Sequence, residues 1–263
     1  MATDLLSRID LAFCVDLTSS MTPFIEAARA QMHRILDGVR ATPHVDLRVA
    51  IVGYRDHGSL PVTEVNAFTA KTVVTKKVLD AMRVQSPPEN TDAAEAVFSG
   101  LVACLDLDWR EGSYKVVVLV GDAPPHACGA DASPFPDRFK DGDPTGLSLD
   151  DVANRLEDKG IFLHALGMVP SVTSHHDAVL ERSFKRLAIG TGGAFHAARN
   201  ADGAMAVVES ISARSLRDLE FDRRLFAIAK SERDVELLAK QLETSNDAVN
   251  AGMMRLRQRG LVR

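Results

Sequence analysis

The chain has 263 residues, of which 46% are hydrophobic and 25% charged, and its net charge is −5. This balance excludes a disordered chain and allows one α/β domain with a small appendage. The weak negative charge gives the whole chain no bias toward nucleic acid or membranes. We expect a cytoplasmic protein that does not enter a membrane. No apolar run reaches the ~18 residues of a membrane span, no signal peptide is visible, and an odd number of cysteines argues against a disulfide framework.

Apolar runs that suit buried strands recur along the chain. They are rich in Val, Ile and Leu and are bounded by Gly, Asp or Pro, as in strands that are covered on both faces. These runs occupy residues 9–15, 45–52, 115–120 and 161–169. Between them, apolar residues return every three or four positions, which predicts helices. The predicted helices cover residues 21–39, 72–82, 91–105, 149–159 and 176–189, and a short strand is expected at 194–197.

The order of these elements predicts the fold class. Strands alternate with helices almost throughout, which indicates an α/β fold with a doubly wound, mostly parallel, Rossmann-like sheet. Residues 63–68 alternate in polarity and are expected to add an antiparallel edge strand. His164, within a buried run, is expected to be a hydrogen-bonded core residue. The proline-rich stretch 123–146 predicts an irregular loop at the carboxyl edge of the sheet, where ligands of such folds bind.

Oxygen-bearing side chains follow two of the predicted strands. The first strand ends in Asp16-Leu-Thr18-Ser-Ser20, and the strand ending at residue 120 delivers Asp122 to the same edge. Carboxylates and hydroxyls suit a hard cation such as Mg²⁺ or Mn²⁺. Asp16 alone would be a helix cap or turn residue more often than a ligand. The convergence of several loops therefore carries the metal interpretation.

A third loop brings Thr91 and Asp92 before a predicted helix. With Asp16-x-Thr18-x-Ser20 and Asp122, this pattern resembles the metal-ion-dependent adhesion site of von Willebrand factor A (vWA) domains. The resemblance covers residues 9–198 and is to a bacterial, intracellular branch. General vWA domains use a threonine at the third loop, whereas this branch often has an acid, so either Thr91 or Asp92 remains a candidate ligand.

The resemblance implies a binding module and not an enzyme. It implies a bound Mg²⁺ or Mn²⁺ whose open coordination position takes an Asp or Glu carboxylate of a partner protein, with an AAA+ ATPase, a kinase or a defence-system component as expected partners. Arg55, Asp56 and His126 are expected at the rim of the site, where a partner would touch them; a surface salt bridge is the plainer alternative for the first two. A phosphatase of the haloacid dehalogenase type would need an acid where Thr18 stands, and no G-x-S-x-G elbow is present.

The C-terminal residues differ in charge from the rest of the chain. Residues 221–263 hold nine basic and six acidic side chains, a net charge of +3. Their pattern of helix, short turn and helix resembles a helix-turn-helix or winged-helix core. We therefore expect a vWA domain over 5–213 and a small helical unit over 221–263. The unit either binds DNA through Asn246, Asn250 and Arg257, as in a transcription regulator, or docks on protein.

Overall fold

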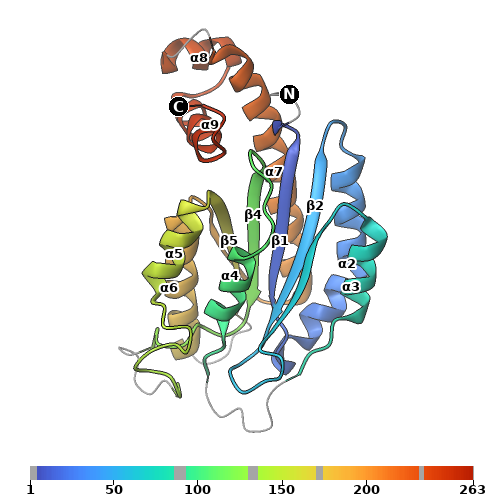
Figure 1. The fold of residues 1–263 in the computed structure, drawn as a ribbon, viewed down its shortest axis with the longest axis vertical. Coiled ribbons are helices and arrows are strands. Elements are labelled where there is room, and N and C mark those ends of the chain that lie inside the picture. Colours follow the sequence, from blue (N-terminus) through green and yellow to red (C-terminus); the bar gives the residue numbers. More distant parts are fainter. Residues whose placement is uncertain (1–4, 86–92, 130–135, 170–173, 231–233, 263) are drawn as a thin grey trace.

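A six-stranded sheet forms the centre of the protein (Figure 1). The computed structural model describes residues 5–85, 93–129, 136–169, 174–230 and 234–262. The strands are β1 (Arg8–Asp16), β2 (Asp46–Tyr54), β3 (Thr63–Thr69), β4 (Tyr114–Gly121), β5 (Ile161–Met168) and β6 (Phe195–Ala198). Their spatial order is β3-β2-β1-β4-β5-β6, and only the β2–β3 pair is antiparallel. The predicted doubly wound α/β sheet with an antiparallel edge strand is confirmed.

Helices cover both faces of this sheet because the central strands are apolar on both sides. On β1, Phe13 and Val15 join one core while Ala12 and Cys14 join the other, as the alternation of a strand requires. The first core lies under α2 (Thr22–Ala41), α3 (Thr72–Ala81) and α7 (Ala201–Ile228), and the second under α4 (Val97–Leu105), α5 (Leu149–Asp158) and α6 (Ser174–Gly190). A single 3₁₀ turn, η1 (Ser19–Met21), joins β1 to α2.

Helix α4 begins later than the sequence predicts. The backbone N–H groups of Ala93 and Glu95 donate to the carbonyl oxygens of Pro136 and Pro124, at 2.9 and 3.0 Å. The N–H of Ala96 bonds to the carbonyl of Arg55. These donors are engaged by neighbouring loops, so the α-helical pattern starts only at Val97.

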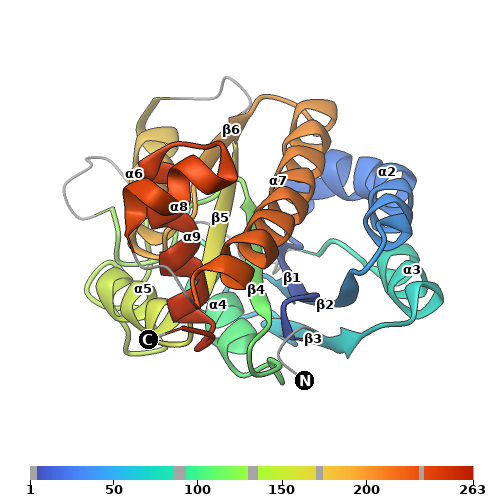
Figure 2. The same cartoon turned by 90° about the horizontal axis from the view of Figure 1, so that it is seen from above.

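The longest helix joins the sheet to the C-terminal unit. Helix α7 runs without a break through the boundary that we expected between residues 213 and 221. Its last turns pack against α8 (Val235–Leu242) and α9 (Asn246–Gln258) around a third core (Figure 2). The members of this core include Leu6, Leu225, Phe226, Leu238, Val249 and Leu256. Neither α7 nor any other helix in the described part of the chain has the length and apolar content to span a membrane.

Arginines at the C-terminal end of α9 bond to α7 and to the segments that precede β4 and β1. Arg255 donates to both carboxylate oxygens of Asp222, at 2.7 to 3.1 Å, and both residues are buried. Arg259 donates to the carbonyl oxygens of Gly112 and Leu5, at 3.1 and 2.9 Å. Two arginines that made the C-terminal segment basic are therefore bonded inside the protein.

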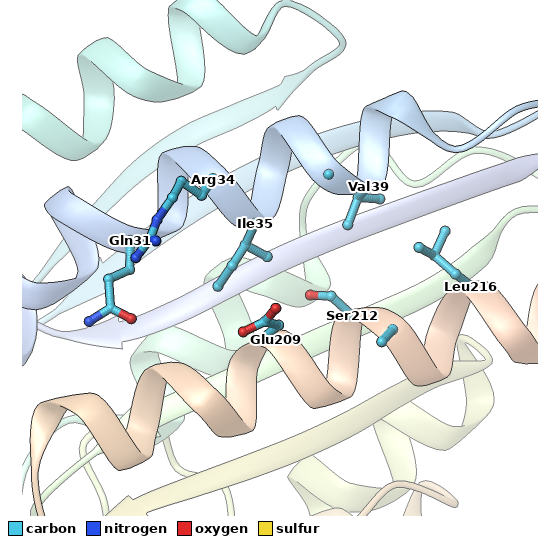
Figure 3. A pocket seen from close by; sticks show the side chains of 9 residues that line it. Gln31, Arg34, Ile35, Val39, Glu209, Ser212 and Leu216 are labelled. Carbon is cyan, nitrogen blue, oxygen red and sulfur yellow. The ribbon is translucent and has the colours of Figure 1, made fainter.

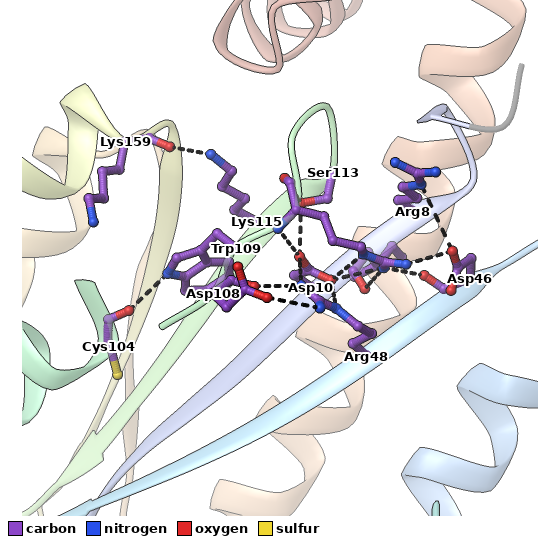
Figure 4. A network of polar contacts seen from close by, with 12 residues as sticks. Arg8, Asp10, Asp46, Arg48, Cys104, Asp108, Trp109, Ser113, Lys115 and Lys159 are labelled. Atoms are coloured by element: carbon purple, nitrogen blue, oxygen red, sulfur yellow. Dashed lines mark hydrogen bonds and ion pairs between the residues drawn. The ribbon is translucent and has the colours of Figure 1, made fainter. Parts of the chain in front are cut away.

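A second polar network closes the same end of the sheet (Figure 4). Asp10 of β1 is fully buried and accepts hydrogen bonds from Arg48, Ser113 and both the backbone and the side chain of Arg110. Burial alone would raise the pKa of Asp10, but the bonds from Arg48 and Arg110 outweigh it and leave that pKa below its usual range. Arg110 also bonds to Asp46 of β2. The network ties β1, β2 and the loop before β4 together at the edge opposite the predicted metal loops.

Candidate metal centre

The loop after β1 gathers three side-chain oxygens. Asp16 and Thr18 are buried, and Ser20 is exposed. Asp16 Oδ1 accepts hydrogen bonds from the backbone N–H of Thr18 at 2.8 Å and from its hydroxyl at 2.6 Å. The hydroxyls of Thr18 and Ser20 lie 3.2 Å apart. The Asp-x-Thr-x-Ser spacing thus places one carboxylate and two hydroxyls side by side at the carboxyl edge of the sheet.

Asp122 reaches the same place from the neighbouring strand. Strands β1 and β4 pair in parallel with Val15 opposite Val120, so both chains leave the sheet together. Burial and the nearby charge of Asp122 raise the pKa of Asp16 to about 8. Burial also raises the pKa of Asp122. Two carboxylates that crowd each other in this way are stabilised by a cation between them.

One oxygen of Asp16 lacks a hydrogen-bond partner. Asp16 Oδ2 is buried, and no donor among the described residues reaches it. Leaving such an atom unsatisfied costs free energy, so its position calls for an explanation. A hard divalent cation fits the donor set, which consists of carboxylates and hydroxyls without thiol or imidazole.

The hydroxyls are essential to this assignment. Within the described ranges no group of three or more His, Cys, Asp and Glu side chains is placed to hold a metal ion. Asp16 and Asp122 would therefore need Thr18 and Ser20, together with the third loop, to complete a coordination shell. Thr91 and Asp92, the two candidates on that loop, lie outside the described residues.

Close packing behind the site leaves room only for glycine at position 121. A Cβ atom on Gly121 would overlap the hydroxyl of Tyr54 and approach the carboxylate of Asp16. Tyr54 is fully buried, and its hydroxyl lies 3.4 Å from the carbonyl oxygen of Val120. This contact links the ends of β2 and β4 across β1, the strand that carries Asp16.

The three residues expected at the rim are buried, so the expected surface position is wrong. His126 and Asp56 are fully enclosed, and Arg55 is 4% exposed. The guanidinium of Arg55 donates to the carbonyl oxygen of Arg83 at 3.1 Å and to Glu64 at 3.3 Å. In this conformation a partner cannot touch these side chains.

His126 joins the loop after β4 to the loop after β2. Its Nε2 lies 2.8 Å from Asp56 Oδ1, and its Nδ1 lies 2.7 Å from Asp137 Oδ1. Burial alone would lower the pKa of His126, but the two carboxylates outweigh it and raise that pKa. Arg138 bonds to the other oxygen of Asp56 and to the carbonyl of His57. We call Asp56, His126, Asp137 and Arg138 the loop latch.

Sequence reasoning missed the two latch residues beyond position 126. Asp137 accepts hydrogen bonds from the backbone N–H groups of Ala127 and Phe139, both at 2.8 Å, and so shapes the irregular loop from within. The only signal in the sequence is an Asp-Arg pair inside a proline-rich stretch. That pattern does not indicate a partner eleven residues away.

Comparisons with known proteins support the fold. No family model matches the chain. Over 146 residues, 55% of this chain, it is 28% identical to alpha-protein kinase vwkA of Dictyostelium discoideum, and the match spans 23% of that kinase. The chain therefore covers about a quarter of that relative.

Two solved structures show the same architecture at low sequence identity. The pilus adhesin SpaC of Lactobacillus rhamnosus GG, in its open conformation, matches with a TM-score of 0.59 and 13% identity, over 81% of this chain and 30% of the adhesin. Proximal thread matrix protein 1 of the mussel byssus, with a zinc-occupied metal-ion-dependent adhesion site, matches with a TM-score of 0.56 and 18% identity, over 81% of this chain and 47% of that protein. The fold of the chain is vWA-like.

Proposed function

We propose, on the premise of this vWA-like fold, that the chain is a protein-binding module that depends on a divalent metal ion. Asp16, Thr18, Ser20 and Asp122, with Thr91 or Asp92, would hold Mg²⁺ or Mn²⁺. The observation that carries the proposal is the buried, unsatisfied Oδ2 of Asp16 beside the carboxylate of Asp122. When bound, the ion would offer an open coordination position to an Asp or Glu carboxylate of a partner.

The residues of the chain prepare this site for a ligand that arrives from solvent. Thr18 orients the Asp16 carboxylate through two hydrogen bonds. Ser20 is exposed at the mouth of the site. The loop latch holds the loop of Asp122 against the loop after β2. If Asp92 is the third-loop ligand, three carboxylates surround the ion and a neutral oxygen becomes the better partner ligand.

The names of the similar solved structures support a binding role. SpaC is a pilus adhesin, and the mussel protein has a zinc-occupied adhesion site. The kinase relative supports kinases as one partner class; an AAA+ ATPase or a defence-system component would suit the same module. We propose the cytoplasm as its compartment, since all three cysteines are free thiols.

We further propose that the module is not an enzyme. A strand-end Asp that acts as a nucleophile needs an acid nearby to protonate the leaving group. The residue two positions after Asp16 is Thr18, and its hydroxyl is already donated to the Asp16 carboxylate.

Thermal unfolding with and without Mn²⁺ tests the metal site. A ligand at 100 times its Kd stabilises the fold by about 2.7 kcal/mol, and each kcal/mol raises Tm by about 2–4 °C in a protein of this size. We expect such a rise in the wild type with Mn²⁺ or Mg²⁺ and a smaller one with Ca²⁺. We expect none in the double variant Asp16→Asn/Asp122→Asn. The matched control is Asp106→Asn, an exposed acid at the end of α4, which should leave the rise unchanged.

Equal rises in the double variant and the wild type would remove the basis of the proposal.

Binding of a partner through the metal ion needs a separate test. A protein captured by the wild type should be lost on addition of EDTA and should not be captured by the double variant. Its affinity should also fall when one particular Asp or Glu of that partner is changed to the amide. Capture that survives chelation would show that the ion plays no part in binding.

A further inference from the structure

Helices α7 and α9 pack together at the end of the molecule opposite the metal loops (Figures 1 and 2). A groove lies between them. Its volume is about 520 Å³. Phe221, Ala248 and Ala251 line it and are half-buried. The two helices approach closely at Gly252, where a Cβ atom would lie 2.8 Å from the ring of Phe221. The floor of the groove is therefore apolar and consists of one aromatic ring and two alanine side chains.

Arginines form the α7 wall of this groove. Arg214, Arg217 and Arg224 are exposed and line it from one side of the helix, over about 15 Å of its length. Within the described part of the chain, Arg217 and Arg224 have no carboxylate within 4.0 Å, and Arg214 has only a 3.8 Å contact with Asp218. Such charges attract an anionic partner and steer its approach.

A second groove on the surface, beside the same helix α7, lacks this bias. It lies between α2 and α7, has a volume of about 320 Å³, and is lined by Ile35, Val39 and Leu216 (Figure 3). Its polar lining includes Arg34 on one helix and Glu209 on the other, one charge of each sign. The α2/α7 groove therefore does not select for the charge of an occupant, whereas the α7/α9 groove does.

We propose that the α7/α9 groove docks an acidic amphipathic helix of a partner protein. The apolar side of that helix would lie on Phe221, Ala248 and Ala251, and its carboxylates would pair with the exposed arginines. A nucleic acid fits less well, because Asp218 and Glu220 interrupt the row of arginines. A continuous phosphate backbone would have to pass both acids, whereas separate carboxylates on a helix can be placed opposite separate arginines. The proposal is independent of the metal site, which lies at the other edge of the sheet.

A display library of helical peptides of about 16 residues, about 24 Å as a helix, tests this on the full chain. Peptides are selected on the wild type and counter-selected on Arg217→Glu/Arg224→Glu. We expect the enriched sequences to carry Asp or Glu together with apolar residues spaced three and four apart. Their affinity, measured by fluorescence anisotropy, should fall about tenfold or more in the double variant and on raising the salt concentration.

The matched control is Arg34→Glu/Lys77→Glu, which makes the same change of charge at two exposed residues outside the groove. It should change the affinity by less than about twofold. Ala251→Leu fills the floor without altering charge and should also weaken binding; thermal melts verify that each variant is folded. No enrichment of acidic peptides, or equal binding to both double variants, would overturn the proposal. So would a 20-base-pair DNA duplex that displaces the peptides and depends on Arg217 and Arg224.

Discussion

His126 Nε2 lies 2.8 Å from Asp56 Oδ1, and both side chains are fully buried. This contact crosses from the loop after β4 to the loop after β2, two segments that the sheet itself does not join. Asp122 stands only four residues before His126. The buried pair therefore anchors the loop that begins with Asp122, one of the proposed metal ligands.

Replacing His126 with Ala should destabilise the protein strongly. The carboxylates of Asp56 and Asp137 would lose their shared partner inside the protein, and breaking a buried pair costs about 3–5 kcal/mol. Urea denaturation measures this loss. The control His33→Ala removes a half-exposed histidine that lies 3.5 Å from Asp80, and it should cost less than about 1 kcal/mol. Similar costs for the two variants would show that the latch contributes no more than a surface contact.

Replacing Gly121 with Ala should disturb the metal centre directly. The added methyl group meets the hydroxyl of the buried Tyr54, and forcing a side chain into such packing costs about 1–3 kcal/mol. The Mn²⁺-dependent rise in Tm should shrink as well. At Gly38 a Cβ atom would meet nothing within 4 Å, so Gly38→Ala within α2 should stabilise the protein by about 0.5–1 kcal/mol. Thermal melts should show a lower Tm for Gly121→Ala and a higher Tm for Gly38→Ala than for the wild type.

Acid should destabilise the protein through His164. This residue is buried in the core, as expected, and its Nδ1 has no hydrogen-bond partner in the described ranges. Burial and the positive charges of His196 and Arg214 lower the pKa of His164 from 6.5 to about 4. As the pH falls below 6.5, His164 becomes protonated in the unfolded chain, whereas in the folded protein it stays neutral down to about pH 4. The free energy of unfolding therefore decreases as the pH falls from 6.5 to about 4.

At pH 5 this effect costs about 2 kcal/mol, since each pH unit is worth about 1.4 kcal/mol. His164→Leu and His164→Gln both remove the titration. The difference in free energy of unfolding between each variant and the wild type should shift by about that amount in favour of the variant when the pH is lowered from 8 to 5. This shift does not depend on how stable the variant is at pH 8. Denaturant titrations at the two pH values measure the change, and a difference that is independent of pH would contradict it.

The buried pair between α7 and α9 should make the C-terminal unit part of one cooperative structure. Asp222→Leu leaves Arg259 buried without its carboxylate and leaves Arg255 only the 3.5 Å contact with Asp218, so it should cost about 3–5 kcal/mol. Arg223→Ala breaks only a surface pair with Glu220 and should cost less than about 1 kcal/mol. Circular dichroism should show a single transition in the wild type. Two separate transitions would mean that the unit unfolds by itself.

The sheet could be predicted from the sequence because each strand is marked by residues that are adjacent in the chain. Each central strand is a continuous apolar run, and parallel pairing of β1 with β4 follows from the alternation with helices. Asp16 and Asp122 could thus be assigned to one edge before any coordinates were known. Thr18 and Ser20 follow from the same loop.

The remaining features depend on contacts that no local pattern encodes. Asp137 meets His126 only because the chain turns back on itself, with Ala127 in the left-handed region at φ 60°. The basic charge of residues 221–263 allowed either DNA contact or docking on protein, and it gave no sign that Arg255 and Arg259 are bonded inside the protein. Helix α7 simply continues past the expected boundary.

The bond from Arg259 to the carbonyl of Leu5 has a mechanical consequence. It brings the two ends of the described chain to one pole of the molecule, away from the loops of Asp16 and Asp122 (Figure 1). A force applied between these ends would pull the end of α9 away from Gly112 and Leu5 and would load β1 directly, because β1 begins at Arg8. The protein can therefore be tethered by either end in a flow cell or an optical trap with its metal loops facing the solution.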